Sequence, residues 1–85
     1  MPEVEVYTTP VCPYCSAAKE LLRRKGVPFL EIDVAGEPQR RAEMVARANG
    51  RTTVPQVFVG DTHLGGCDDL YALDDAGELD RLVTT

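Results

Sequence analysis

The sequence lacks the long apolar segment that a membrane-spanning helix requires. A helix needs about 20 consecutive apolar residues to cross a bilayer, and no stretch of this chain approaches that length. The first residues, Met-Pro-Glu-Val-Glu, also lack the basic and apolar regions of a secretory signal peptide. We therefore expect a cytoplasmic protein with no membrane partner.

Positive charge is scarce and unevenly distributed. Nine Lys and Arg residues stand against 14 Asp and Glu residues, which gives a net charge of −5. Residues 1–51 hold eight basic and seven acidic residues, whereas residues 52–85 hold only Arg81 against seven acids. A nucleic-acid-binding surface needs a basic face to contact phosphates. The composition therefore argues against nucleic acid as a partner.

Cysteine is also infrequent, with three residues at positions 12, 15 and 67. An odd number in a reducing cytoplasm does not indicate a framework of structural disulfides. Two of the three form a C-x-x-C pair, and such a pair near a β-α-β pattern indicates redox catalysis or metal binding. The third, Cys67, is equally consistent with an inert buried residue and with a further redox thiol.

The chain has the length of one small domain, residues 1–85, and 44% of its residues are hydrophobic. Its periodicity and turn signals predict the element order β-α-β-α-β-β-α. The predicted strands are 3–7, 27–34, 57–59 and about 63–64. The predicted helices are about 13–25, about 38–48, and a last helix from about 67 with a break near 76–77. Inward-facing positions are Ala18, Leu21 and Leu22 in the first helix and Ala42, Val45 and Ala48 in the second.

The order of these elements predicts a mixed sheet. A β-α-β unit makes the first two strands parallel, with a right-handed crossover, and the tight turn at Gly60-Asp61-Thr62 makes the last two antiparallel. We expect a thioredoxin-like α/β fold, in which a four-stranded mixed sheet is flanked by three or more helices. The C-x-x-C pair would lie at the end of the first strand.

The tetrapeptide Cys12-Pro13-Tyr14-Cys15 carries the predicted chemistry. Pro13 suits the first position of a helix, because its missing N–H would have no partner there. Cys12 then lies at the N-cap, where free amide groups and the helix dipole stabilise a thiolate. We predict that Cys12 is the nucleophile and that Cys15, inside the first turn, is the resolving thiol.

A structural zinc site is the alternative for the same residues. Cys12, Cys15, Cys67 and His63 would supply three thiolates and one imidazole. Pro-Tyr between the first two thiols and a helix after them favour a nucleophile instead, and His63 fits better as a hairpin residue. Redox chemistry with no metal is therefore the preferred interpretation.

Three motifs together resemble the glutaredoxin family, specifically its small bacterial dithiol members. They are Cys-Pro-Tyr-Cys at 12–15, Arg-Thr-Thr-Val-Pro-Gln-Val-Phe at 51–58 and Gly-Gly-Cys-Asp-Asp-Leu at 65–70. The resemblance covers essentially the whole chain, and the order and separation of three motifs make it far more specific than a lone C-x-x-C. It implies a thioredoxin-like fold and a glutathione-disulfide oxidoreductase.

The resemblance also implies the partners. Glutathione would be a reducing co-substrate rather than a tightly bound cofactor, and glutathione reductase would act indirectly through oxidised glutathione. Disulfide-containing or glutathionylated proteins would be the substrates of a monomeric enzyme. In a monothiol route Cys12 alone would remove glutathione from a protein, and in a dithiol route Cys15 would resolve a mixed disulfide between Cys12 and the substrate.

The glutathione site implied by the resemblance involves the second and third motifs. The bond before Pro55 would be cis, and the backbone of Val54 would pair with the cysteinyl part of glutathione. Free amides at the start of the last helix would hold the γ-glutamyl carboxylate, with Asp68 pairing with the ammonium group and capping the helix. The glycyl carboxylate would contact Gln56 and either Arg40 or Arg41. The full predicted binding set is Tyr14, Arg40, Arg41, Thr53, Val54, Pro55, Gln56, Gly66, Cys67, Asp68 and Asp69.

One departure from the family pattern and two alternative functions accompany the resemblance. Close relatives often carry a lysine shortly before the C-x-x-C, in contact with the glycyl carboxylate, whereas this chain has Thr-Thr-Pro-Val at 8–11 and its nearest following lysine is Lys19. A [2Fe-2S] carrier, with Cys12 of two chains and two glutathiones as ligands, is the alternative function. A thioredoxin-type reductase is disfavoured because the chain has no tryptophan.

Overall fold

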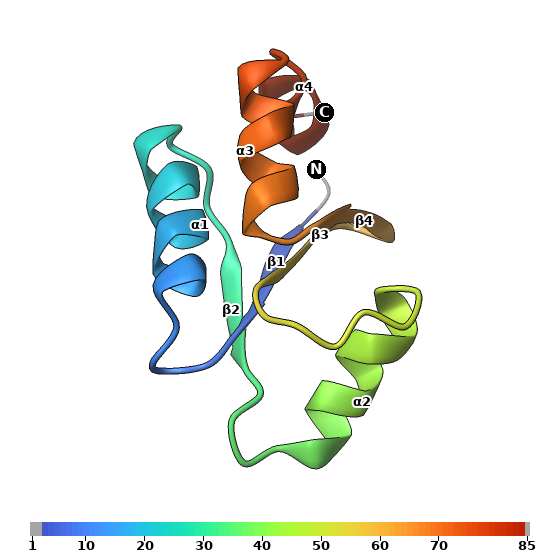
Figure 1. Cartoon of the computed structure of the whole chain (residues 1–85). Helices are drawn as coiled ribbons and strands as arrows, with labels where there is room; N and C mark the ends of the chain where they lie inside the picture. Colours follow the sequence, from blue (N-terminus) through green and yellow to red (C-terminus); the bar gives the residue numbers. More distant parts are fainter. Residues whose placement is uncertain (1–2, 85) are drawn as a thin grey trace.

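The computed structural model describes residues 3–84, so residues 1, 2 and 85 of the expected domain lie outside the described residues. A four-stranded sheet lies between helices on both of its faces (Figure 1). The elements are β1 (Val4–Thr8), α1 (Pro13–Arg24), β2 (Leu30–Asp33), α2 (Pro38–Arg47), β3 (Gln56–Val59), β4 (Thr62–Gly65), α3 (Cys67–Asp75) and α4 (Leu79–Thr84). The predicted element order is confirmed, and the expected break near residues 76–77 separates α3 from α4.

The sheet has the strand order β2-β1-β3-β4. Strand β1 is parallel to β2 and antiparallel to β3, and β3 is antiparallel to β4. The mixed sheet of the thioredoxin-like fold is therefore confirmed. Because β1 is a central strand, the loop that follows it and the start of α1 are held at one end of the sheet.

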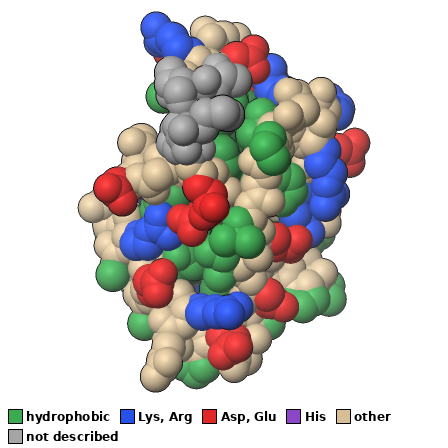
Figure 2. Space-filling model, turned by 180° about the vertical axis from the view of Figure 1, so that it is seen from behind, with side chains coloured by type: hydrophobic (Ala, Val, Ile, Leu, Met, Phe, Trp, Pro, Cys, Tyr) green, Lys and Arg blue, Asp and Glu red, His purple; other side chains and the backbone are tan. Residues whose placement is uncertain are grey.

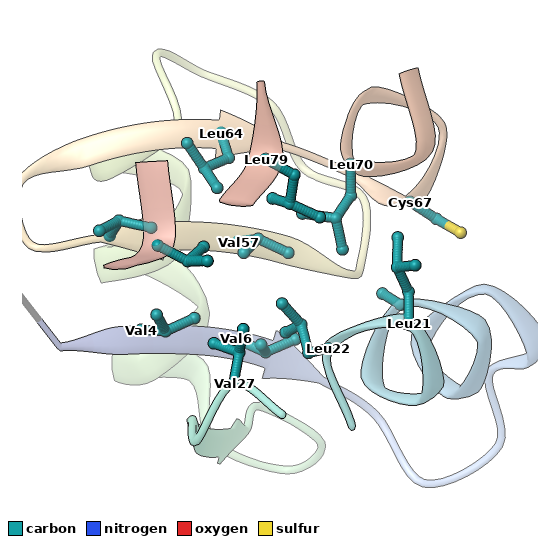
Figure 3. Packing of buried hydrophobic residues seen from close by; sticks show 13 residues of the cluster. Val4, Val6, Leu21, Leu22, Val27, Val57, Leu64, Cys67, Leu70 and Leu79 are labelled. Carbon is teal, nitrogen blue, oxygen red and sulfur yellow. The ribbon is translucent and has the colours of Figure 1, made fainter. Parts of the chain in front are cut away.

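Alternate residues of β1 and β3 divide the core into two layers. Val4 and Val6 of β1 lie opposite Val59 and Val57 of β3 in the pairing register, and all four are buried in one cluster with α1, α3 and α4 (Figure 3). The buried face of α1 is as predicted: Ala18, Leu21 and Leu22. This packing fixes the starts of α1 and α3 relative to the sheet, because both helices share the same cluster.

The opposite face of the sheet packs against α2. Tyr7 and Phe58 meet there with ring centroids 5.5 Å apart and near-perpendicular planes, and Met44 and Ala48 of the α2 region complete the cluster. The prediction that Ala42 faces inward is wrong, since Ala42 is exposed. It precedes Met44 by two residues, which places it about 200° around the helix axis.

The prediction of a long second strand is also wrong. The strand covers only Leu30–Asp33 and lies at an edge of the sheet, with most of its residues exposed. Val27 is buried, but in the segment before the strand. Pro28 accounts for the difference, because proline has no N–H to donate to a strand ladder and restricts the residue before it.

The surface mixes charges of both signs. On the face shown in Figure 2, acidic and basic side chains are interspersed with apolar ones. Lys25, after the end of α1, joins Asp74 of α3 at 2.7 Å and Asp80 of α4 at 3.1 Å. Within residues 3–84 no helix combines the length and the apolar character that crossing a membrane would take.

Candidate active site

Cys12 occupies the N-cap of α1, as predicted. Its backbone is extended (φ −149°, ψ 102°), Pro13 follows at the first helical position, and no acidic residue lies in the first turn. The Cys12 Sγ atom accepts a hydrogen bond from the backbone N–H of Cys15 at 3.1 Å. At this position the sulfur lies beside the free amide N–H groups and the positive end of the helix dipole.

Cys15 lies behind Cys12 and is 1% exposed. Burial, followed by the hydrogen bond with Cys12, raises the pKa of Cys15 to about 12. Cys12 is partly exposed, and all three cysteines are free thiols. The two positions thus differ as the predicted roles require: an accessible sulfur for attack and a protected, protonated thiol behind it.

A groove of about 270 Å³ lies beside the dithiol. The carbonyl oxygen of Val54, in its wall, is 3.9 Å from Cys12 Sγ and accepts the weak S–H hydrogen bond. The Val54–Pro55 peptide bond is cis, as the resemblance implied. The lining residues are Tyr14, Arg51, Thr53, Val54, Pro55, Gly66, Cys67, Asp68 and Asp69. All predicted binding residues except Arg40, Arg41 and Gln56 are therefore brought together.

The start of α3 forms the far wall of the groove. The Asp69 carboxylate accepts a hydrogen bond from the backbone N–H of Gly66 at 2.9 Å, so Asp69 rather than Asp68 caps this helix. The same oxygen accepts a hydrogen bond from Arg51 at 2.8 Å. These two donors, Arg51 first, lower the pKa of Asp69. Asp68 is exposed and free to face a ligand in the groove.

Arg51 is a groove residue that the sequence did not identify. It belongs to the second motif, but its partner Asp69 is 18 residues further along the chain. Both side chains of the pair are about half exposed, at 46% and 47%. The only signal in the sequence was the position of a basic residue directly before the segment 52–55. The pair offers a ligand one cation and one anion side by side.

The three remaining predicted residues lie outside the groove lining. Arg40 donates to the carbonyl oxygen of Asp33 at 3.5 Å and lines a separate cavity against β2. Arg41 donates to the carbonyl oxygen of Thr52 at 3.1 Å, next to the groove. Gln56 is fully buried, and its amide nitrogen donates to the Thr53 carbonyl and hydroxyl oxygens at 2.9 and 3.2 Å. Arg41 and Gln56 therefore hold the segment that forms the groove wall.

Cys67 begins α3 and lies in the groove wall at 9% exposure. Burial raises the pKa of its thiol, and the negative charge of Asp68 raises it further. The surroundings favour a protonated thiol. They support the inert role considered for this residue more than a third redox role.

The zinc alternative finds no support in the geometry. Among residues 3–84 no group of three or more His, Cys, Asp and Glu side chains is arranged to hold a metal ion. His63 Nε2 is already 2.6 Å from the Gln56 side-chain oxygen.

Three features occur here on a thioredoxin-like fold. They are an accessible sulfur at a helix N-terminus, a buried thiol three residues later, and a groove bounded by a cis-proline loop. Together they define the class of a thiol-disulfide oxidoreductase.

Comparisons with known proteins place the chain more narrowly. The glutaredoxin family model matches residues 4–64. A glutaredoxin from Pseudomonas aeruginosa is 60% identical over 84 residues, covering 99% of each chain. The solution structure of a glutaredoxin from Brucella melitensis is 58% identical and has a TM-score of 0.88, covering 100% of this chain and 91% of the other. The crystal structure of a buckwheat glutaredoxin–glutathione complex is 30% identical and has a TM-score of 0.89, covering 98% and 77%. The chain belongs to the glutaredoxin family.

Proposed function

We propose that this glutaredoxin uses glutathione to reduce protein disulfides and protein–glutathione mixed disulfides. The observation that carries the proposal is the groove beside Cys12. Val54, which contacts Cys12 Sγ, lines this groove together with the ion pair of Arg51 and Asp69. Glutathione is a short extended peptide with a thiol in its middle and a zwitterionic γ-glutamyl end. A ligand bound with its sulfur at Cys12 would reach those charges with that end.

The charges at the far end of the groove match the γ-glutamyl group. Its ammonium group would face Asp69 or the exposed Asp68. Its carboxylate would accept hydrogen bonds from Arg51 and from the backbone amides at the start of α3, which lack partners within the helix. The Arg51–Asp69 pair need not break, because the guanidinium keeps further N–H groups and the carboxylate keeps a second oxygen. The buckwheat relative, crystallised with glutathione, supports this choice of ligand.

The glycyl end of glutathione would lie near the start of the segment 52–55. Arg41 holds the Thr52 carbonyl oxygen there, and it stays the predicted partner of the glycyl carboxylate. Tyr14, which is 64% exposed, would cover the ligand beside Cys12. Gln56 would act from outside the groove by holding Thr53, whereas Arg40 faces a separate cavity and is assigned no contact with the ligand.

The monothiol route needs only Cys12. Its thiolate attacks the glutathione sulfur of a glutathionylated protein, the protein–glutathione S–S bond breaks, and the protein leaves as a thiolate. A second glutathione thiolate then attacks the glutathione sulfur bound to Cys12, releases oxidised glutathione and restores the Cys12 thiolate. Cys15 stays protonated throughout, as its burial favours.

The dithiol route adds Cys15. Cys12 attacks a protein disulfide and forms a mixed disulfide with one of its sulfurs. Once Cys12 is a disulfide, its charge and its hydrogen bond no longer raise the pKa of Cys15, although burial still does. Cys15 then gives up its proton, attacks Cys12 and releases the reduced protein. Two glutathiones return the Cys12–Cys15 disulfide to the dithiol.

The reduction potentials of glutaredoxins, about −200 to −230 mV, suit exchange with a glutathione pool. We propose that residues 1–85 form one catalytic domain that acts as a monomer. We place it in the cytoplasm because thiols there are kept reduced by glutathione. The weaker alternative is a carrier of a glutathione-ligated [2Fe-2S] cluster. A brown colour after anaerobic reconstitution with iron and sulfide would revive it.

Trapping the monothiol intermediate tests the proposal. The Cys15→Ser variant is incubated with a glutathionylated peptide, and the adduct is mapped by mass spectrometry. We expect one glutathione on Cys12 and none on the buried Cys67. A protein that releases no peptide thiol and carries no glutathione on Cys12 would refute the proposed function.

A further inference from the structure

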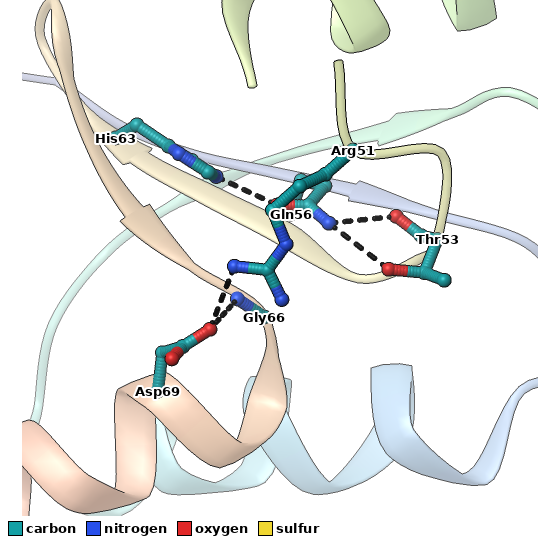
Figure 4. Close-up of polar contacts among 6 residues, drawn as sticks. All are labelled: Arg51, Thr53, Gln56, His63, Gly66 and Asp69. Atoms are coloured by element: carbon teal, nitrogen blue, oxygen red, sulfur yellow. Dashed lines mark hydrogen bonds and ion pairs between the residues drawn. The ribbon is translucent and has the colours of Figure 1, made fainter. Parts of the chain in front are cut away.

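A chain of polar contacts, centred on the buried Gln56, lies beneath the groove and involves a residue that does not line it (Figure 4). His63 Nε2 in β4 is 2.6 Å from the side-chain oxygen of Gln56 in β3. The Gln56 amide nitrogen in turn donates to both oxygens of Thr53, at 2.9 and 3.2 Å. Gln56 is fully buried, so water does not replace these partners. The chain thus connects the β3–β4 hairpin to the groove wall.

The contacts fix the direction of every hydrogen bond in the chain. A side-chain amide oxygen only accepts, so His63 Nε2 must carry a hydrogen and donate it. Turning the Gln56 amide over would set its oxygen against the Thr53 carbonyl oxygen, and two acceptors cannot form a hydrogen bond, whichever tautomer His63 adopts. Leaving buried groups unpaired in this way is unfavourable. The Thr53 carbonyl therefore selects the orientation in which the amide nitrogen of Gln56 faces Thr53, and His63 supports this orientation by donating to the amide oxygen.

This orientation defines what Thr53 offers to a ligand. Because its hydroxyl oxygen accepts from Gln56, the hydroxyl hydrogen stays available to donate elsewhere. Thr53 lines the groove, and its neighbour Val54 lies against Cys12 Sγ. The hydroxyl hydrogen is thus available as a donor in the groove wall, one residue before the carbonyl group that contacts Cys12 Sγ.

His63 is itself held firmly. Its ring stacks on Phe58, with centroids 4.9 Å apart and planes 29° apart. Phe58 belongs to the buried cluster beneath α2. The donor of the chain therefore rests on the core of the molecule and not on a solvent-exposed side chain.

We propose that His63 is a positioning residue for substrate binding, which acts through Gln56 to orient the hydroxyl and carbonyl groups of Thr53 in the groove. The inference rests on the proposed function in that the ligand is a glutathione-bearing disulfide. His63 touches neither the reacting sulfurs nor the ligand. Its loss should weaken binding of the ligand without slowing attack by Cys12.

The first experiment tests the chain of contacts without any substrate. The protein has two glutamines, the buried Gln56 and the exposed Gln39, so NMR can compare the hydrogen exchange of their side-chain amides directly. We expect slow exchange at Gln56 in the wild type, slow exchange in His63→Gln and fast exchange in His63→Phe. Exchange at Gln56 as fast as at Gln39 in the wild type would overturn the proposal.

The two variants form a matched pair. His63→Phe keeps a ring on Phe58 and removes the donor. His63→Gln removes the ring and keeps an N–H donor, since the amide nitrogen of glutamine is the same number of bonds from the backbone as Nε2 of histidine. If His63→Phe does not fold, His63→Asn replaces it, because its shorter side chain places the donor out of reach.

The second experiment measures kcat and KM for a glutathionylated peptide. We expect His63→Phe to raise KM roughly fivefold to tenfold, because the buried amide oxygen of Gln56 loses its partner. Its kcat should stay within about twofold of the wild-type value. Both constants of His63→Gln should be close to those of the wild type. An unchanged KM in His63→Phe, or an equal loss in His63→Gln, would overturn the proposal. Inactivity of the wild type would refute the proposed function instead, and the NMR result would still decide whether His63 orients Thr53.

Discussion

Arg51 donates to the Asp69 carboxylate at 2.8 Å and joins the two walls of the groove beside Cys12. The pair connects the segment before β3 to the cap of α3. Because both side chains are about half exposed, the pair contributes little to stability, about 1 kcal/mol or less. Its position favours a role in ligand binding over a role in folding.

Replacing Arg51 by methionine should therefore weaken substrate binding more than stability. We expect KM for a glutathionylated peptide to rise roughly tenfold, since a charge-assisted contact to a carboxylate is lost. Arg24→Met is the matched control, because it removes the same charge from an exposed position at the end of α1. Equal KM values for the two variants would show that Arg51 does not bind the ligand.

The raised pKa of Cys15 predicts the order in which the thiols react. At pH 9, iodoacetamide should modify Cys12 in the folded protein while Cys15 remains thiol, since its pKa is raised to about 12 and it is 1% exposed. Peptide mapping by mass spectrometry gives the modified fraction at each position. Rapid modification of Cys15 in the folded protein, at the rate seen in denaturant, would contradict the protected position assigned to it.

The same pKa also predicts a loss of stability in alkaline solution. A group whose pKa is raised by folding stabilises the folded state below its unfolded pKa, about 8.5 for cysteine, and this stabilisation is lost as the pH rises through the folded value. The free energy of unfolding in urea should fall between pH 8.5 and 10 in the wild type. The fall should be smaller in Cys15→Ser, and equal slopes would contradict the prediction.

Gly65 should tolerate no side chain. Its φ is +112°, and an added Cβ would lie 2.4 Å from the Asp69 oxygen that caps α3 and pairs with Arg51. We expect Gly65→Ala to cost about 1–3 kcal/mol in unfolding free energy and to raise KM, because Asp69 must move. Gly36→Ala is the control: its φ is +69°, with nothing within 4 Å of the added Cβ. If Gly65→Ala lost no more stability than Gly36→Ala and kept its KM, Asp69 would not be confined as described.

The sequence predicted the parts of the fold that depend on local signals. Pro13 and Pro38 mark the starts of α1 and α2 as expected, because proline fits the first helical position whatever the tertiary context. The error at residues 27–34 came from treating an apolar run as one strand in spite of Pro28. Ala42 was expected to be buried but is exposed. The buried face of α2 is set by its packing against the sheet, and the composition of the helix does not specify that packing.

The site was predictable where its residues are neighbours in a motif. Arg51 was missed because its role depends on Asp69, which only the folded chain brings to it. Gln56 was predicted to contact the ligand, yet two-residue alternation along β3 places it on the same face as Phe58 and away from Val57. Its burial follows from that alternation. The contact with His63 could not be predicted, because it depends on the register of the β3–β4 hairpin.

The central claim is glutathione-dependent catalysis through Cys12. Its most direct test is NADPH consumption in an assay with glutathione, glutathione reductase and a small glutathione mixed disulfide, run on the wild type, Cys12→Ser and Cys15→Ser. We predict activity in the wild type and in Cys15→Ser and none in Cys12→Ser. Undiminished activity in Cys12→Ser, or none in the wild type, would contradict the account.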